Sequence, residues 1–544
     1  MSTVTQAERE PAEAHASEGH RIRGTLVVAA VAAALVLVAA VYVWQHDWFL
    51  LIGDAQSHLN IARRVNDAVE PDFVKIGTVW LPFPHLLLLP FVQSFALWQS
   101  GWAGAIVGIG CMALAAGALW RVGYWVGLRT VPRIIVVGVF VLNPSILYLY
   151  TISLTESVLI TALLAALAGI ARWAVADPPI SPGELTVFAG VPTAAAVLSR
   201  YEGWAFAAAA SVVIILISLK RWRSLRYTAS LVFAYLVVPV VAAAWWISFN
   251  WVRFGDPLEF ARGEYSAASQ QAILVASGSL PAQGNLWLSV WTYNWAVVAV
   301  VGVPLLVLAA IGGILLIVTR GRSITALVIW LAAFAYPFAI FSVYLGQTAI
   351  FNEHSLPAGL WNQRYAACLV PFVALLIGVS ADLAFRRSRR IGKAVFSAIL
   401  AVIIGFSLWS IASPVARIAV IGEGFSQSGP AAGTRVGSNG IAVASWVGDH
   451  YQGGDILIDE TSILNLIQLR VPLSKVVGLY TGQPFENNLV DVSPSVTWVL
   501  ADTNNVHDRV WTALKNNPSF RNRFAAVYTS GTMTAFKRID SGGQ

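Results

Sequence analysis

A carboxylate and an imidazole lie four residues apart in the sequence "IGDAQSHLN". Asp54 follows Gly53 and opens a helical stretch, so Asp54 and His58 are expected on one face of a single helix. A carboxylate in this position could act as a general base that removes the proton of an acceptor hydroxyl. The alternative is structural, because Asp is also a common residue at the N-terminal cap of a helix.

Two further acidic residues stand at the ends of apolar stretches. Glu156 lies in "TISLTESVL" and Glu202 lies in "LSRYEGW". An ionisable residue at membrane depth is a candidate functional residue, although the helix dipole also favours a solvated Glu in the first turn of a helix. We predict a catalytic role for Glu156 and a role in substrate binding for Glu202.

Two Arg-Tyr pairs could bind a phosphate group. Arg200 and Tyr201 lie in the same "LSRYEGW" turn, and Arg364 and Tyr365 lie in "WNQRYAACLVP". A guanidinium group binds phosphate oxygens with a planar pair of donors. The alternative is an interfacial anchor that extends its charge to the lipid headgroups.

The composition is that of a polytopic membrane protein. Of 544 residues, 57% are hydrophobic and 12% are charged, whereas soluble proteins carry about 25% charged residues. The two cysteines, Cys111 and Cys368, lie in apolar stretches, and no Cys/His spacing of a zinc site occurs. We ascribe the formal charge of +7 to arginines that orient the helices rather than to nucleic-acid binding.

Eleven apolar stretches are predicted to cross the membrane. They cover about 24–44, 102–120, 131–150, 157–175, 186–199, 203–219, 228–249, 295–318, 324–345, 365–383 and 392–412. A further stretch, 79–98, contains three prolines, each of which removes a helix hydrogen bond. If 79–98 does not cross, every Arg/Lys cluster falls on the side of the amino terminus. The sequence therefore predicts a cytoplasmic amino terminus and a half-inserted helix at 79–98.

This topology brings all the candidate residues to the extracytoplasmic face of a plasma-membrane protein. The outer segments are the loop 45–101, the turns at 151–156 and 199–203, and the loops 250–294 and 346–364. His58, Lys75 and His85 belong to the first of these loops and could approach a lipid phosphate. Lys and Arg are usually concentrated on the cytoplasmic side of a membrane protein. Two arginines on the outer face are therefore unusual, which favours a functional role for Arg200 and Arg364.

Three regions are expected along the chain. Residues 1–23 are predicted to be a disordered cytoplasmic segment, 24–413 a transmembrane domain, and 414–544 an extracytoplasmic α/β domain. In the last region we expect strands at "GGDILIDE" and "VTWVLAD", a helix at "VHDRVWTALKNN" and a hairpin at "FAAVYTSGTMTAFKRI". The Gly- and Ser-rich stretch 422–440 is predicted to link the last span to this domain.

The predicted outer face suggests a reaction with a lipid-borne substrate, because nucleotide sugars are scarce there. A polyprenyl-phosphate sugar would place its chain in the bilayer, its phosphate at the headgroups and its sugar in the loops. Asp54 would act as the base, and Arg200 and Arg364 would neutralise the leaving phosphate. Membrane lipids and a glycan, lipid or protein acceptor are the expected partners, and nucleic acid is not.

The order of these motifs resembles the GT-C superfamily of membrane glycosyltransferases. More narrowly, "DAQSHLNIARRV", "WLPFPHLLLL" and "NPSILYLYTISLTESVLITALL" resemble the glycosyltransferase 39-like group, which contains protein O-mannosyltransferases and aminoarabinose transferases. The resemblance covers about 24–220 and, more loosely, 360–380. It implies an inverting transfer from a polyprenyl- or dolichyl-phosphate sugar, with mannose as the default, Asp54 as the catalytic base and Glu156 as a second acidic residue.

The sequence departs from this group where a Lys-Pro-Pro stretch often precedes the half-inserted helix. Here "WLPFP" stands in its place, and Lys75 is a possible substitute for the lysine. The group mostly acts without a metal, so we expect no cofactor, although two carboxylates could hold Mg²⁺ or Mn²⁺.

Three other functions stay open. The first is a GT-C enzyme of another branch, such as an arabinosyltransferase or an oligosaccharide ligase. The second is a lipid or solute transporter, which would require ionisable residues within the spans and matching halves. The third is a scaffold that displays the C-terminal domain, which would leave Asp54, Glu156 and the two arginines without a role.

Overall fold

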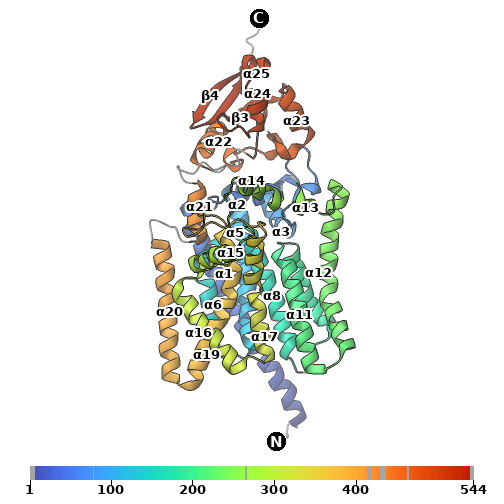
Figure 1. The fold of residues 1–544 in the computed structure, drawn as a ribbon, viewed down its shortest axis with the longest axis vertical. Helices are drawn as coiled ribbons and strands as arrows, with labels where there is room; N and C mark the ends of the chain where they lie inside the picture. Colours follow the sequence, from blue (N-terminus) through green and yellow to red (C-terminus); the bar gives the residue numbers. More distant parts are fainter. Residues whose placement is uncertain are drawn as a thin grey trace.

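Apolar helices form most of the molecule, and a small β-sheet lies beyond one end of them (Figure 1). The computed structural model describes residues 6–77, 79–177, 179–263, 266–412, 419–428, 437–461 and 465–539. Among these residues, eight helices are long and apolar enough to cross a membrane. The prediction of a multi-pass helical membrane protein with a small C-terminal α/β domain is confirmed.

The candidate spans are α1 (Gln6–Gln45, apolar from Ile22), α5 (Trp102–Trp125), α8 (Thr155–Val175), α11 (Glu202–Trp222), α12 (Leu225–Phe254), α16 (Val303–Arg320), α17 with α18 (Ile324–Tyr344) and η4 with α19 (Gln363–Arg387). Helix α8 is the most deeply buried of the candidate spans, and α5, α11 and α17 pack against it. Shorter elements between them are α6 (Thr130–Val141), α7 (Pro144–Leu149), α9 (Pro182–Leu185), η2 (Thr186–Gly190), α10 (Val191–Val197), α13 (Glu259–Arg262), α14 (Ala267–Ala276) and α15 (Leu286–Val301). Helix α20 (Arg389–Ala412) covers the last predicted stretch.

Two predicted spans are broken in the structure. The stretch 295–318 is divided at Gly302, whose φ of +85° ends α15, and Pro304 lies in the first turn of α16. The stretch 131–150 is divided where the side chain of Asn143 caps α7 and Pro144 begins it. Gly and Pro impose these breaks through backbone geometry, which hydropathy alone does not register.

The amino-terminal segment 1–23 was predicted to be disordered, and its residues 1–5 lie outside the described residues. From Gln6 onward the structure has helix α1, which continues without a break into the first span. Extending an existing helix costs little compared with nucleating one, and Ala and Glu in this segment are good helix formers.

The stretch 79–98 forms two short helices, α3 (Phe83–Val92) and α4 (Phe95–Ser100). The ten residues of α3 rise about 15 Å, which is half of the roughly 30 Å hydrocarbon core. Pro82 precedes α3 and Pro84 lies in its first turn, while Pro90 lies inside it. Helix α3 is therefore too short to span a bilayer.

The C-terminal domain contains a five-stranded sheet with the order β2-β1-β3-β5-β4. Strands β1 (Asp455–Ile458), β2 (Val476–Val477) and β3 (Val496–Asp502) are parallel, and β5 (Met533–Arg538) is antiparallel to both β3 and β4 (Phe524–Ser530). Its helices are α22 (Ser438–His450), α23 (Gln483–Val490), α24 (Arg509–Leu514) and α25 (Pro518–Arg523). The predicted strands, hairpin and helix are confirmed, whereas β2, α22, α23 and α25 were not predicted.

This domain rests on the far end of α2 (Gly53–Arg64), the helix that carries Asp54. The carboxylate of Asp67 accepts hydrogen bonds from the backbone N–H groups of Leu473 (3.1 Å) and Ser474 (2.9 Å). Arg64 and Glu460 form a buried ion pair of 2.7 Å. One helix thus joins the domain to the candidate base.

We expect this contact to weaken at acidic pH. Burial opposes ionisation of Asp67, but hydrogen bonds from Ser474, the charge of Arg63 and the N–H of Leu473 together hold its pKa below the ordinary value. A lowered pKa means that ionised Asp67 stabilises the contact at neutral pH and that this stabilisation is lost as the pH falls through that pKa. Hydrogen exchange at Leu473 and Ser474, corrected for the intrinsic rate, should therefore rise on acidification.

The same amides should exchange faster at neutral pH in the variant Asp67→Ala. Asp491→Ala is the matched control, because Asp491 is an exposed carboxylate on the surface of the C-terminal domain. If the two amides stay protected in Asp67→Ala, the carboxylate does not hold the domain on α2.

Candidate active site

Three helices begin close together and each carries a carboxylate in its first turn. Asp54 lies in the first turn of α2, Glu156 in that of α8 and Glu202 in that of α11. The partial positive charge at a helix N-terminus favours an ionised carboxylate there. These helix starts therefore assemble acidic groups from segments that are far apart in the sequence.

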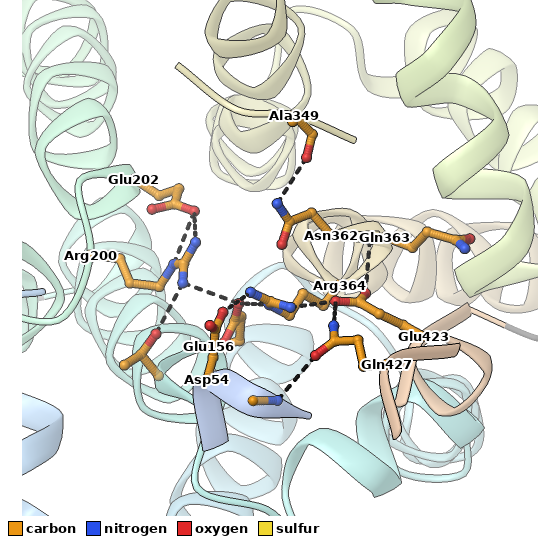
Figure 2. Close-up of polar contacts among 12 residues, drawn as sticks. Asp54, Glu156, Arg200, Glu202, Ala349, Asn362, Gln363, Arg364, Glu423 and Gln427 are labelled. Carbon is orange, nitrogen blue, oxygen red and sulfur yellow. Dashed lines mark hydrogen bonds and ion pairs between the residues drawn. The ribbon is translucent and has the colours of Figure 1, made fainter. Parts of the chain in front are cut away.

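Arg364 lies at the centre of the site (Figure 2). Its Nε donates to Glu156 Oε1 at 2.9 Å, its Nη2 donates to Asp54 Oδ2, and its Nη1 donates to Glu423 Oε1. All three guanidinium nitrogens thus face a carboxylate. Charge-assisted bonds of this kind are stronger than neutral ones.

A second guanidinium group lies beside the first. Arg200 Nη1 donates to Glu156 Oε1 at 3.1 Å and to Thr155 Oγ1 at 3.0 Å, and Arg200 Nη2 donates to Glu202 Oε1 at 3.0 Å. Glu156 Oε1 therefore bridges the two arginines. The guanidinium carbon of Arg200 also lies 4.7 Å from the ring centroid of Tyr365, a cation–π contact.

Asp54 is the accessible carboxylate of the Arg364 cluster. Its side chain is 34% exposed, whereas that of Glu156 is 1% exposed and that of Glu423 is 0% exposed. Arg364 itself is 5% exposed. A substrate that reaches this cluster meets Asp54 before the other acidic groups.

The structural alternatives for these residues are wrong in three respects. Asp54 does not cap α2, because Ile52 occupies the cap position and Asp54 lies in the first turn of the helix. Glu156 is buried rather than solvated. Arg200 and Arg364 bind carboxylates inside the protein instead of extending to headgroups.

His58 and His85 form a buried pair beside this cluster. His58 Nδ1 lies 2.8 Å from His85 Nε2. The His58 ring packs against Trp80, with 4.6 Å between the ring centroids. Burial lowers the pKa of His58 to about 3, although the charge of Glu156 opposes this shift. His58 is therefore neutral at physiological pH, so it could contact a phosphate by hydrogen bonding and not as a cation.

Lys75 and Tyr201 are placed differently from the other predicted residues. Lys75 lies in η1 (Phe73–Ile76), where burial lowers its pKa and where its charged neighbours include Arg64 and Glu460 at the interface with the C-terminal domain. Tyr201 donates its hydroxyl to the carbonyl of Val79 at 3.0 Å. The structure does not bring either side chain to Arg364.

Sequence reasoning missed Glu423 and Gln427. Both lie in α21 (Ala419–Ser428), within the stretch 422–440 that was predicted to be a linker. The single acidic residue within the otherwise apolar "IAVIGEGF" was the available signal. Burial raises the pKa of Glu423, although Arg364 opposes this effect.

Among the described residues, no group of three or more His, Cys, Asp or Glu side chains is arranged to hold a metal ion. Asp54, Glu156 and Glu423 each contribute a carboxylate oxygen to Arg364.

At the level of the fold, the helical region and its long first loop are similar to solved structures. The structure of ArnT from Cupriavidus metallidurans in the apo state is similar, with a TM-score of 0.55 and 14% identity over 94% of this chain and 99% of that one. The GT-C fold predicted from the sequence is thereby confirmed.

Structures of an archaeal enzyme also match. The Archaeoglobus fulgidus oligosaccharyltransferase in the apo form has a TM-score of 0.49 and 12% identity over 88% of this chain and 69% of that one. Archaeoglobus fulgidus AglB in complex with an inhibitory peptide and a dolichol-phosphate has a TM-score of 0.47, 12% identity and the same coverage, 88% and 69%. No protein-family model and no curated protein matches the sequence.

Proposed function

We propose that this protein is an integral membrane glycosyltransferase that moves a sugar, by default mannose, from a polyprenyl-phosphate donor to an acceptor hydroxyl. The observation that carries the proposal is the partly exposed carboxylate of Asp54, held by Arg364 next to a second guanidinium group. A base beside cationic groups matches the two needs of this transfer, which are removal of a proton and stabilisation of a departing phosphate.

The proposed reaction is a displacement at the anomeric carbon. Asp54 Oδ2 is bound to Arg364, so the other carboxylate oxygen accepts the proton of the acceptor hydroxyl. The acceptor oxygen forms a bond to the anomeric carbon while the bond from that carbon to the phosphate oxygen breaks. The electron pair leaves with the polyprenyl phosphate, whose charge Arg364 and Arg200 stabilise, and attack from the opposite face inverts the anomeric centre.

A cavity of about 670 Å³ supports a lipid-linked donor. Its walls include Gly302 and Val303 at the break between α15 and α16, and Val402 of α20. The buried amide of Gln363 lines it too, one residue before Arg364. We propose that the isoprenoid chain lies here and not along the half-inserted helix predicted at 79–98, a stretch that does not line this cavity.

The distribution of arginines supports an extracytoplasmic site. At the far end of the η4–α19 segment, Asp382 contacts Arg320 at 3.6 Å and Arg386 at 2.7 Å, and it accepts the backbone N–H of Arg129 at 3.2 Å. Arg364 lies at the other end of the same segment. By the positive-inside rule, this distribution favours a cytoplasmic position for the Asp382 end and an outer position for Arg364.

Consumption of a radiolabelled lipid donor tests this function. Purified protein in lipid nanodiscs should release polyprenyl phosphate from polyprenyl-phosphate mannose when cell-envelope extract supplies mixed acceptors, and the Asp54→Asn variant controls for contaminating enzymes. A donor with a truncated chain should react more slowly if the cavity binds the isoprenoid. If neither this donor nor polyprenyl-phosphate arabinose, aminoarabinose or glucose is consumed, the proposed function is wrong.

A further inference from the structure

Helix α21 brings a buried carboxylate to the candidate active site from a segment that precedes the C-terminal domain. Glu423 is 0% exposed and accepts Arg364 Nη1. Its second oxygen, Oε2, accepts the backbone N–H of Gln363 at 3.1 Å. Glu423 thus binds the side chain of Arg364 and the backbone of the residue before it.

The same helix contacts the start of α2. Gln427 donates to Glu423 Oε1 at 3.2 Å, and Gln427 Oε1 accepts the backbone N–H of Gly53 at 3.0 Å. Gly53 directly precedes Asp54. One turn of α21 is therefore bonded to Gly53, which precedes Asp54, and to Gln363, which precedes Arg364. Figure 2 shows Glu423 and Gln427 beside Arg364.

The three carboxylates on Arg364 are not equivalent. Glu156 and Glu423 are buried and accept hydrogen bonds from Nε and Nη1, respectively. Asp54 is partly exposed and accepts one from Nη2. Two buried anchors on a planar guanidinium group fix the direction of its third nitrogen. The direction of Nη2 toward Asp54 is therefore set from the buried side of the site.

We propose that Glu423 is a positioning residue that holds Arg364 Nη2 against Asp54. This inference rests on the proposed transferase function. Without Glu423, Arg364 keeps only one buried anchor and can swing toward an anionic phosphate and away from Asp54. Misplacement of a positioned group by about 1 Å can cost about 100-fold in rate.

The variant Glu423→Gln tests this role, since it keeps the shape of the side chain and removes its charge. We expect kcat to fall about 10- to 100-fold while KM changes little. Glu486→Gln is the matched control, because Glu486 pairs with Arg509 on the surface of the C-terminal domain.

A double-mutant cycle separates positioning from general structural damage. If Glu423 acts through Arg364 on Asp54, adding Glu423→Gln to Asp54→Asn should lower kcat no further. An additive loss, or an unchanged kcat in Glu423→Gln alone, would overturn the proposal.

A measurement that needs no turnover distinguishes this inference from the proposed function. Modification of Arg364 by phenylglyoxal, followed by mass spectrometry, should be faster in Glu423→Gln, with Arg200 as the internal reference. If wild type consumes no donor but Arg364 becomes more reactive, the transferase function fails and the positioning contact stands. If the reactivity of Arg364 is unchanged, the positioning role itself is refuted.

Discussion

Replacement of Asp54 by Asn is expected to slow consumption of the lipid donor by about 10²- to 10⁴-fold, the usual contribution of a general base. Asn keeps the size of the side chain and can still accept a hydrogen bond from Arg364, but it cannot take up the proton of the acceptor. Because Asp54 is not proposed to bind the isoprenoid or the phosphate, binding of the donor should be nearly unchanged. Single-turnover kinetics with separately measured donor binding would show this split.

Asp72→Asn is the appropriate control for this prediction. Asp72 lies in the same first loop, and its side chain is 47% exposed in an ion pair with Arg253. Exposed pairs contribute little to stability, so the control should turn over donor at the wild-type rate. An Asp54→Asn variant as fast as Asp72→Asn would transfer the role of base to another carboxylate, of which Glu156 is the nearest candidate.

Much of the site could be predicted because its residues lie at the ends of apolar stretches. Once the Arg/Lys clusters fix the topology, Asp54, Glu156, Arg200 and Arg364 must all lie at one membrane surface. That argument places side chains within a layer but does not say which of them touch. Which side chains contact one another depends on the rotation of each helix about its own axis. That rotation is set by packing between segments that are distant in the sequence.

Glu423 shows what hydropathy and composition fail to detect. Its segment is rich in Gly and Ser, which favoured a linker, yet α21 packs into the protein and buries the carboxylate against Arg364. The two residues are 59 positions apart, so no local pattern links them. The breaks at Gly302 and Asn143 were missed for a related reason, since capping and positive φ act on single residues within long apolar stretches.

Removal of Arg364 is expected to have the largest effect on stability. In Arg364→Gln the carboxylates of Glu156 and Glu423 remain buried, and Glu423 loses the cation that compensates its charge. Breaking a buried ion pair from one side typically costs about 3–5 kcal/mol, because an uncompensated charge stays inside the protein. Activity should be lost as well, since Asp54 and the leaving phosphate lose their shared cation. Reversible unfolding in mixed micelles would measure the loss of stability.

The double variant Arg364→Gln/Glu423→Gln identifies the cause of that loss. It removes the cation together with one enclosed anion, so it should unfold less readily than Arg364→Gln alone while remaining inactive. Arg262→Gln serves as the control, because Arg262 pairs with Asp256 in an exposed loop. If the double variant is no more stable than Arg364→Gln, uncompensated charge is not what destabilises the single variant. The three carboxylates would then not destabilise the fold in the absence of Arg364. The role of Arg364 would be its contact with the substrate.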